Sequence, residues 1–358
     1  MDAQTYNFHG VVVRLHAADD QLLRRLRIDY GYFLVEPAAA DATGEAHLTV
    51  TAHRKTPDYD SLPALRATIY SPRNICYTQD TTTYIDYFGK ALSVYDRAAK
   101  RIDIYSDDLH LLHETVFMTF LSRVGELLER RKMHRVHGLC FEKDGRAFIF
   151  MAPSGCGKTT LGMALMKRNL PLKLVSEDSP LLDRHGQVLP FPLRLGIIGE
   201  RPEGVADEHV TQLNRTEGEA KHLIAVEALG EKVATGPSRP RLLLIGDRSL
   251  GKTCVIERVG FFKGLRAMLR HLVVGVGIYR GVEFLLRTSV LDLVRMMGLF
   301  FSRLRRGVSA LRQSAIYVVY LGRDRDENTD AVVKLLEAHG FGAAEAEKPA
   351  TGEVRHAT

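Results

Sequence analysis

The chain is poor in cysteine and lacks a hydrophobic run long enough to cross a membrane. Its four cysteines, Cys76, Cys140, Cys156 and Cys254, are widely spaced and form no Cys-x-x-Cys pair. This spacing argues against a disulfide framework or a zinc site, and it favours a reducing compartment. The most apolar region, residues 271–301, is interrupted by charged side chains. No stretch therefore reaches the roughly 18 apolar residues that a membrane helix needs.

The first residues also lack the pattern of a secretory signal, which is a basic segment followed by an apolar core. We therefore expect a cytoplasmic protein that does not bind membranes. The formal net charge of +6 arises from 49 basic and 43 acidic residues, a mild excess in a chain of 358. Such a balance suits an anionic small ligand such as a nucleotide, and we predict no nucleic-acid partner.

The most informative pattern is Ala152-Pro-Ser-Gly-Cys-Gly-Lys-Thr159. An apolar stretch, residues 146–152, leads into it and is typical of a short buried strand, and residues 160–168 are typical of a helix. A strand, a glycine-rich loop with Gly-Lys-Thr and a helix together indicate the phosphate-binding loop of nucleoside triphosphate enzymes. The loop N–H groups and the positive end of the helix dipole bind phosphate oxygens.

We predict nucleotide contacts along the whole loop, and ATP and Mg²⁺ as cofactors, although the loop itself does not choose between ATP and GTP. Lys158 is expected to reach the β- and γ-phosphates, and the Thr159 hydroxyl is expected to ligate Mg²⁺. The predicted cofactor-binding residues are Pro153, Ser154, Gly155, Cys156, Gly157, Lys158, Thr159 and Thr160.

A second stretch, Gly246-Asp-Arg-Ser-Leu-Gly-Lys-Thr253, fits the same letters. It also follows an apolar strand, but residues 253–259 alternate with period two and predict a strand rather than a helix. A strand–turn–strand hairpin lacks the helix N-terminus on which phosphate binding depends. The first loop is therefore the stronger prediction.

Acidic and histidine side chains near the first loop complete a candidate phosphotransfer site. Glu177 and Asp178 follow the predicted strand at residues 172–175, and the carboxyl ends of strands in an open α/β sheet face the ligand. Adjacent acids there point to opposite faces, so one can reach Mg²⁺ and the other the substrate. His137 begins the strand of a predicted hairpin that leads into the loop. The alternatives are a helix or turn cap for the acids and a structural role for the histidine.

These residues together resemble the catalytic domain of HPr kinase/phosphorylase and related HPr-kinase-like proteins. The resemblance rests on His137-Gly138-Leu139, on residues 152–159 and on Ser176-Glu177-Asp178, and it covers residues 133–200 best. It implies a fold close to that of phosphoenolpyruvate carboxykinase and phosphorylation of a serine on a protein or peptide. By position it implies four catalytic residues: Lys158 on the phosphates, Glu177 as the catalytic carboxylate, Asp178 on the Mg²⁺ side and His137 assisting.

Several features depart from that family. The first acid is Glu rather than Asp, and the family's Glu-Ile-Arg-Gly signature survives only as a partial match near Arg194, which remains a candidate phosphate contact. Two other functions stay open. A transport-type ATPase would share the loop but needs a Leu-Ser-Gly-Gly-Gln helix and a strand ending in Asp-Glu, which the chain lacks. A nucleotide-binding regulator would bind ATP without transferring phosphate.

The predicted fold class is α/β, with an HPr-kinase-type phosphate-loop core preceded by a β-rich region. We expect a β-rich domain at 1–106, a connecting helix at 107–132, the nucleotide-binding domain at 133–342 and a flexible tail at 343–358. Residues 8–15 and 188–198 each predict one strand, and residues 200–222 predict an irregular loop. Four late arginines, Arg303, Arg305, Arg306 and Arg312, suit a solvated helix face, or a dock for an acidic partner or for transferred phosphate. The sequence does not determine the oligomeric state, and a homo-oligomer is one of the open alternatives.

Overall fold

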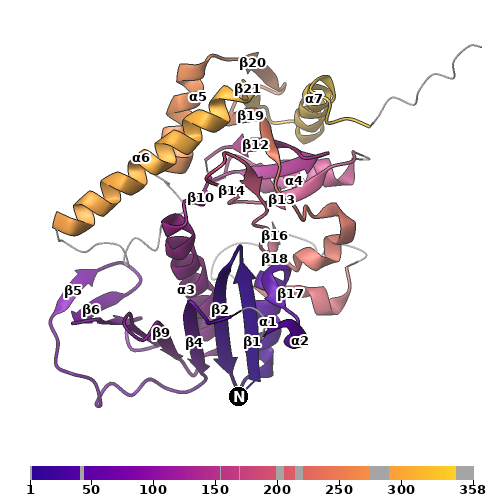
Figure 1. Ribbon diagram of the computed structural model, residues 1–358. Helices are drawn as coiled ribbons and strands as arrows, with labels where there is room; N and C mark the ends of the chain where they lie inside the picture. The colour runs from indigo at the N-terminus through magenta and orange to yellow at the C-terminus, as the bar shows by residue number, and fades with distance from the viewer. Residues whose placement is uncertain are drawn as a thin grey trace, which may run out of the picture.

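The structure is a computed structural model that describes residues 2–40, 44–153, 155–168, 170–198, 205–213, 221–273 and 290–343. Within these ranges the chain forms four β-sheets, and helices pack against the two larger ones (Figure 1). The protein is therefore a mixed α/β protein, as the sequence predicts. No helix within the described ranges is both long and apolar enough to cross a membrane.

The N-terminal part forms a nine-stranded sheet with the order β3-β1-β2-β4-β9-β8-β7-β6-β5. Helices α1 (Asp20–Tyr30) and α3 (Leu109–Arg130) pack against it through an aromatic core that includes Tyr6, Phe8 and Phe120. Asp19 and Asp108 cap these helices by accepting hydrogen bonds from backbone N–H groups of the first turn. The strands are β1 (Asp2–Phe8), β2 (Val11–Ala17), β3 (Leu34–Val35), β4 (Leu48–His53), β5 (Ala67–Tyr70), β6 (Ile75–Gln79), β7 (Thr82–Asp86), β8 (Leu92–Asp96) and β9 (Arg101–Tyr105), and the short helices are η1 (Gly31–Phe33) and α2 (Pro37–Ala40).

Two sequence predictions for this sheet are wrong or incomplete. Residues 8–15 are not one strand, because His9 and Gly10 have φ values of 50° and 87° and turn the chain between β1 and β2. The apolar run looked continuous because both strands of this hairpin bury side chains in the same core. Helix α1 was not predicted. Its arginines and aspartates lie between the buried residues Leu22, Leu23 and Leu26, so the helical spacing of the apolar residues is hard to recognise in the sequence.

A six-stranded sheet with the order β13-β11-β12-β19-β21-β20 carries the predicted phosphate loop. Alternation along β12 (Arg146–Met151) places Phe148 and Phe150 on one face and Ile149 and Met151 on the other. Helices α4 (Lys158–Lys167) and α7 (Arg325–Ala338) cover the first face, and α5 (Phe261–Met268), η5 (Leu269–Val273) and α6 (Val290–Arg312) cover the second. The other strands are β11 (Leu139–Lys143), β13 (Lys173–Ser176), β19 (Arg239–Arg248), β20 (Val255–Arg258) and β21 (Ala315–Leu321).

Strand direction in this sheet brings distant residues to one edge. Strands β12, β19 and β21 are mutually parallel, and β13 has the same direction because it pairs antiparallel to β11, which pairs antiparallel to β12. One edge of the sheet therefore holds the carboxyl ends of β12, β13, β19 and β21 together with the beginning of β11. The loop leaves β12 at this edge. The predicted hairpin before the loop is confirmed, with Asp144 and Gly145 both at positive φ in its turn.

Two small sheets correct the prediction for residues 188–222. The predicted strand at 188–198 is two strands, because Pro190 and Pro192 lie between β15 (Val188–Leu189) and β16 (Leu195–Ile198). The predicted irregular loop at 200–222 contains β17 (Val210–Leu213) and part of β18 (Lys221–Ile224), and both pair in one three-stranded sheet with β16. The other small sheet joins β10 (His134–Arg135), β14 (Leu181–Leu182) and β15, and η3 (Asp207–His209) and η4 (Val226–Lys232) are short helices.

Arg194 joins the two halves of the chain rather than the phosphate loop. Its guanidinium donates to the buried Asp29 carboxylate at 2.7 Å and stacks over the Phe117 ring at 3.9 Å. Asp29 also lies 2.7 Å from His113 Nε2. In this structure the Arg194 side chain is engaged with α1 and α3, so its contacts give no support to the suggested phosphate role.

Candidate functional site

The glycine-rich loop follows β12 and runs into α4, as the sequence predicts. Gly155 and Gly157 have φ values of 81° and 102°, a backbone conformation that residues with a Cβ rarely adopt. Gly157 is the N-cap residue of α4, so the free N–H groups of the first helical turn begin directly after the loop. The two glycines are thus required by the turn, and the loop ends in a helix N-terminus suited to phosphate oxygens.

The remaining loop residues surround this turn. Pro153 is exposed, and Thr160 is exposed on the first turn of α4. Cys156 is buried, and burial raises the pKa of its thiol, so it stays protonated and fills space rather than acting as a nucleophile. Ser154 lies outside the described residues.

Lys158 is buried beneath the loop and uses all three of its ammonium protons. Its Nζ donates to the carbonyls of Ala152 at 2.8 Å and Pro153 at 3.3 Å, and it lies 3.1 Å from His137 Nε2. Burial lowers the pKa of Lys158, and the nearby Asp178 and Glu177 carboxylates partly offset this effect. The lysine is therefore held at the loop by weak neutral acceptors that an anionic ligand can replace.

Thr159 and Glu177 form a direct pair. The Thr159 hydroxyl donates to Glu177 Oε1 at 2.5 Å, which links the first turn of α4 to the end of β13. From the sequence we predict Thr159 and Asp178 together as ligands of Mg²⁺. The contacts instead place the Thr159 hydroxyl beside the other carboxylate, so two oxygen ligands of the kind that Mg²⁺ prefers lie together at Thr159 and Glu177.

Asp178 faces His137 instead. Its Oδ1 lies 3.2 Å from His137 Nδ1, a contact that is electrostatic and lacks the alignment of a full hydrogen bond. The Asp178 side chain is 55% exposed. Partial burial raises the pKa of Asp178, but His137 and the Lys158 charge outweigh it and hold the pKa below its usual value. Adjacent acids at this strand end thus diverge, as predicted: one meets Thr159 and the other meets the histidine.

Gly138 explains why His137 lies here. A Cβ at Gly138 would come within 2.9 Å of the Phe150 carbonyl oxygen, so only glycine lets the start of β11 approach β12 this closely. The Gly138 N–H also donates to the Asp178 backbone carbonyl at 2.9 Å. These constraints hold the buried His137 against both the loop and the end of β13.

His271 belongs to this site although nothing in the sequence marks it. Its ring stacks on His137 with centroids 5.9 Å apart and an interplanar angle of 17°, and its carbonyl accepts the His137 backbone N–H at 2.8 Å. The side chain is 4% exposed and lies on η5, a single π-helical turn. Burial, together with the electrostatic effect of His137 and Lys158 nearby, lowers the pKa of His271 to about 4. A lone histidine in an apolar stretch carries no local signal of this role.

The lowered pKa of His271 predicts a specific loss of stability in mild acid. The unfolded state takes up the proton near the ordinary pKa of about 6.5, whereas the folded state resists it until about 4. Stability is therefore complete above the unfolded value and falls as the pH drops toward 4. We expect wild type to lose about 2–3 kcal/mol more than H271F between pH 7 and pH 4.5, measured by urea unfolding. Equal losses in both proteins would contradict the burial of a neutral imidazole.

The second loop match has no helix behind it. Strand β19 ends at Arg248, and the chain continues into β20, so the predicted strand is confirmed. The predicted hairpin is wrong, because β21 lies between β19 and β20 and pairs with both. Lys252 is exposed and lies 4.0 Å from Asp324 rather than beneath a phosphate turn. The match therefore lacks the helix N-terminus that follows the first loop.

The second match nevertheless brings two charges to the first loop. Gly246 packs against β12, since a Cβ there would come within 2.4 Å of the Phe150 ring and 2.8 Å of Ala152 Cβ. Asp247 and Arg248 follow at the carboxyl end of β19, both exposed, and their charges act on the pKa of Cys156. The sequence did not point to these two residues, because their place beside the loop depends on the parallel pairing of β12 with β19.

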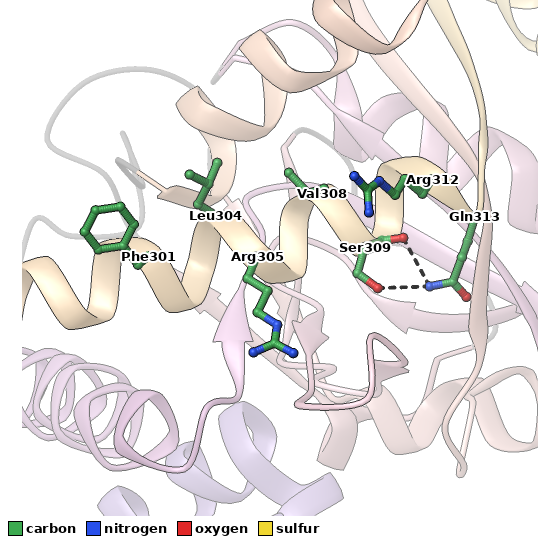
Figure 2. Close-up of a pocket in the computed structure, with 7 residues that line it drawn as sticks. All are labelled: Phe301, Leu304, Arg305, Val308, Ser309, Arg312 and Gln313. Carbon is green, nitrogen blue, oxygen red and sulfur yellow. Dashed lines mark hydrogen bonds between the residues drawn. The ribbon is translucent and has the colours of Figure 1, made fainter.

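The late arginines divide between the interior and a groove. Arg303 is buried and pairs with Glu129 at 2.9 Å, and Glu129 also bonds His134. Arg305 and Arg312 are exposed and lie along a cavity of about 520 Å³ on α6 (Figure 2). The other residues that line it are Phe301, Leu304, Val308, Ser309 and Gln313. No residue of the phosphate loop lines this cavity, so it is separate from the site.

The donor set fits a magnesium ion better than a transition metal. Within the described ranges, no group of three or more His, Cys, Asp or Glu side chains is arranged to hold a metal. One hydroxyl and one carboxylate are the few protein ligands that Mg²⁺ takes when phosphate oxygens and waters supply the rest. Comparison of the chain with known protein families finds no matching family model, and no curated protein is detectably similar to it.

Proposed function

We propose that this protein is an ATP- and Mg²⁺-dependent kinase that transfers the γ-phosphoryl group to a serine hydroxyl of a protein or peptide. The observation that carries this proposal is the convergence at one sheet edge of Lys158, the Thr159–Glu177 pair and the Asp178–His137 pair. The serine acceptor and the HPr-kinase-type core come from the resemblance of residues 133–200. We expect the protein to act in the cytoplasm, without membrane or nucleic-acid partners.

The first half of the site serves to bind the nucleotide. The loop N–H groups and the end of α4 bind the phosphates, and Lys158 exchanges its contacts with Ala152, Pro153 and His137 for phosphate oxygens. Thr159 and Glu177 are placed to hold Mg²⁺, which when bound neutralises charge on the β- and γ-phosphates. The family resemblance implies Glu177 as the catalytic carboxylate and Asp178 on the Mg²⁺ side. We propose the reverse roles, because the Thr159 hydroxyl bonds Glu177.

The second half serves to receive the acceptor. Asp178 is open to solvent, and His137 and Lys158 keep its carboxylate ionised. As the serine oxygen bonds to the γ-phosphorus and the bond to the β–γ bridging oxygen breaks, the hydroxyl proton passes to Asp178 and ADP leaves. A regulator that only binds ATP has no use for an accessible carboxylate beside the phosphates, and this favours transfer over binding alone.

The direct test is phosphate transfer from radiolabelled ATP. We expect the purified protein with Mg²⁺ and cell extract to label an acceptor on serine, identified by mass spectrometry, and EDTA to abolish the labelling. The matched control is D144N, because Asp144 is an exposed turn residue at positive φ where asparagine is well tolerated. ATP binding without labelling of any extract protein would reject the kinase and favour a nucleotide-binding regulator.

A further inference from the structure

The stacked pair of His271 and His137 defines the orientation of the His137 imidazole. Lysine has only donors, so His137 Nε2, which lies 3.1 Å from Lys158 Nζ, must be the unprotonated nitrogen. The ring proton then sits on Nδ1, on the side of Asp178 at 3.2 Å. The ring is 6% exposed, and it stacks on the face of His271 with an interplanar angle of 17°. Rotation of His137 about its side-chain bonds would break all three contacts.

We propose that His271 is a positioning residue, whose stacked ring fixes the His137 imidazole with Nδ1 toward Asp178 and the Nε2 lone pair toward Lys158. This inference rests on the proposed phosphotransfer function of the site. In a nucleotide-free protein the Nε2 lone pair helps hold Lys158. Once Lys158 moves to the phosphates, the same lone pair is left facing the transferring group, while Nδ1 continues to support the Asp178 carboxylate.

His271 suits this role because it supplies a flat face without a charge. Its titratable neighbours are His137, Lys158 and Arg270, and each lowers the pKa of His271 in addition to burial. A neutral ring leaves Lys158 as the cation directly beneath the loop, so the positive charge is concentrated where phosphate binds. The His271 Nδ1 is buried and has no hydrogen-bond partner among the residues that the structure describes. The ring is therefore held by packing and by the backbone bond to His137 rather than by a polar side-chain partner.

The position of His271 is itself well supported by the fold. It lies on η5, where Leu272 packs with Met268 into the core beneath β12, and α6 covers the turn, with Gly307 closely packed against Leu272. The backbone bond from His137 to the His271 carbonyl does not depend on the side chain. Side-chain variants at 271 therefore test the ring contact while the backbone link remains.

The test measures the tautomer of His137 and the turnover of ATP in the same variants. We expect ¹⁵N NMR of nucleotide-free wild type, assigned with H137N, to show the proton on Nδ1. H271F keeps a flat ring and should preserve this signature, whereas H271A should give a mixture of tautomers. Slow ATP hydrolysis by water should fall about 10- to 100-fold in kcat for H271A with nucleotide affinity within about threefold of wild type, and H271F should stay within about threefold.

The matched control is H110A, since His110 is an exposed histidine on α3. An unchanged tautomer and rate in H271A would overturn the proposal, and so would an H271F variant as impaired as H271A. If H271A does not fold, the wild-type spectrum decides, because a proton on Nε2 of His137 contradicts the assigned orientation. The NMR readout needs no acceptor, so a failure to find phosphotransfer would reject the kinase function without deciding the role of His271.

Discussion

Replacing Asp178 with asparagine should lower phosphotransfer by about 10²- to 10⁴-fold while nucleotide affinity stays within about threefold. Asparagine keeps the size and the contact with His137 but cannot accept the proton of the serine hydroxyl. The carboxylate does not contact Thr159, so its loss should leave the proposed Mg²⁺ ligands intact. The rate is measured with radiolabelled ATP and the identified acceptor, and affinity with a fluorescent nucleotide analogue.

The neighbouring acid provides the comparison for this prediction. E177Q removes the charge beside Thr159, so we expect it to raise the Mg²⁺ concentration required for activity and to recover rate at high Mg²⁺. If E177Q instead abolished transfer at saturating Mg²⁺ while D178N remained active, the two acids would have the roles implied by the family resemblance. D144N should match wild type in both assays.

Replacing Lys158 with methionine should reduce phosphotransfer by about 10²- to 10³-fold, together with nucleotide affinity, without lowering the melting temperature. The loss of phosphotransfer and affinity follows because the lysine is the cation held directly beneath the loop. The melting temperature should not fall, because burial disfavours the charged form of Lys158, as its lowered pKa shows. Methionine fills a similar volume without burying a charge. Activity and thermal unfolding are measured on the same preparation.

The matched control for Lys158 is K167M, at the exposed C-terminal end of the same helix. It removes one positive charge without touching the loop, so activity and affinity should both be preserved. A K158M protein that binds nucleotide normally would contradict the phosphate role of the loop. A melting temperature that falls by several degrees would show instead that the ammonium hydrogen bonds stabilise the fold.

Much of the region around the glycine-rich loop was predictable because its signals are local. The apolar run of β12, the glycines at 155 and 157 and the helix behind them lie within about two dozen residues. The same holds for α3, where the Asp108 cap precedes Leu109, the first residue of the helix, within the predicted connecting helix at 107–132. Prediction from local sequence failed where one apolar run contains two strands, as at the turn of His9 and Gly10. It also failed in α1, where charged residues obscure the helical pattern of apolar side chains.

The sequence by itself determined the loop, its lysine and the two acids at the end of the following strand. Only the tertiary structure decided which partner each acid has, because the pairing of β13 with β11 aims Glu177 at Thr159 and Asp178 at His137. It also decided that His271 stacks on His137 and that β21 separates β19 from β20. The physical reason is that turn residues and periodicity encode neighbours along the chain, whereas contacts across a sheet depend on strand order and on the packing of helices on its faces.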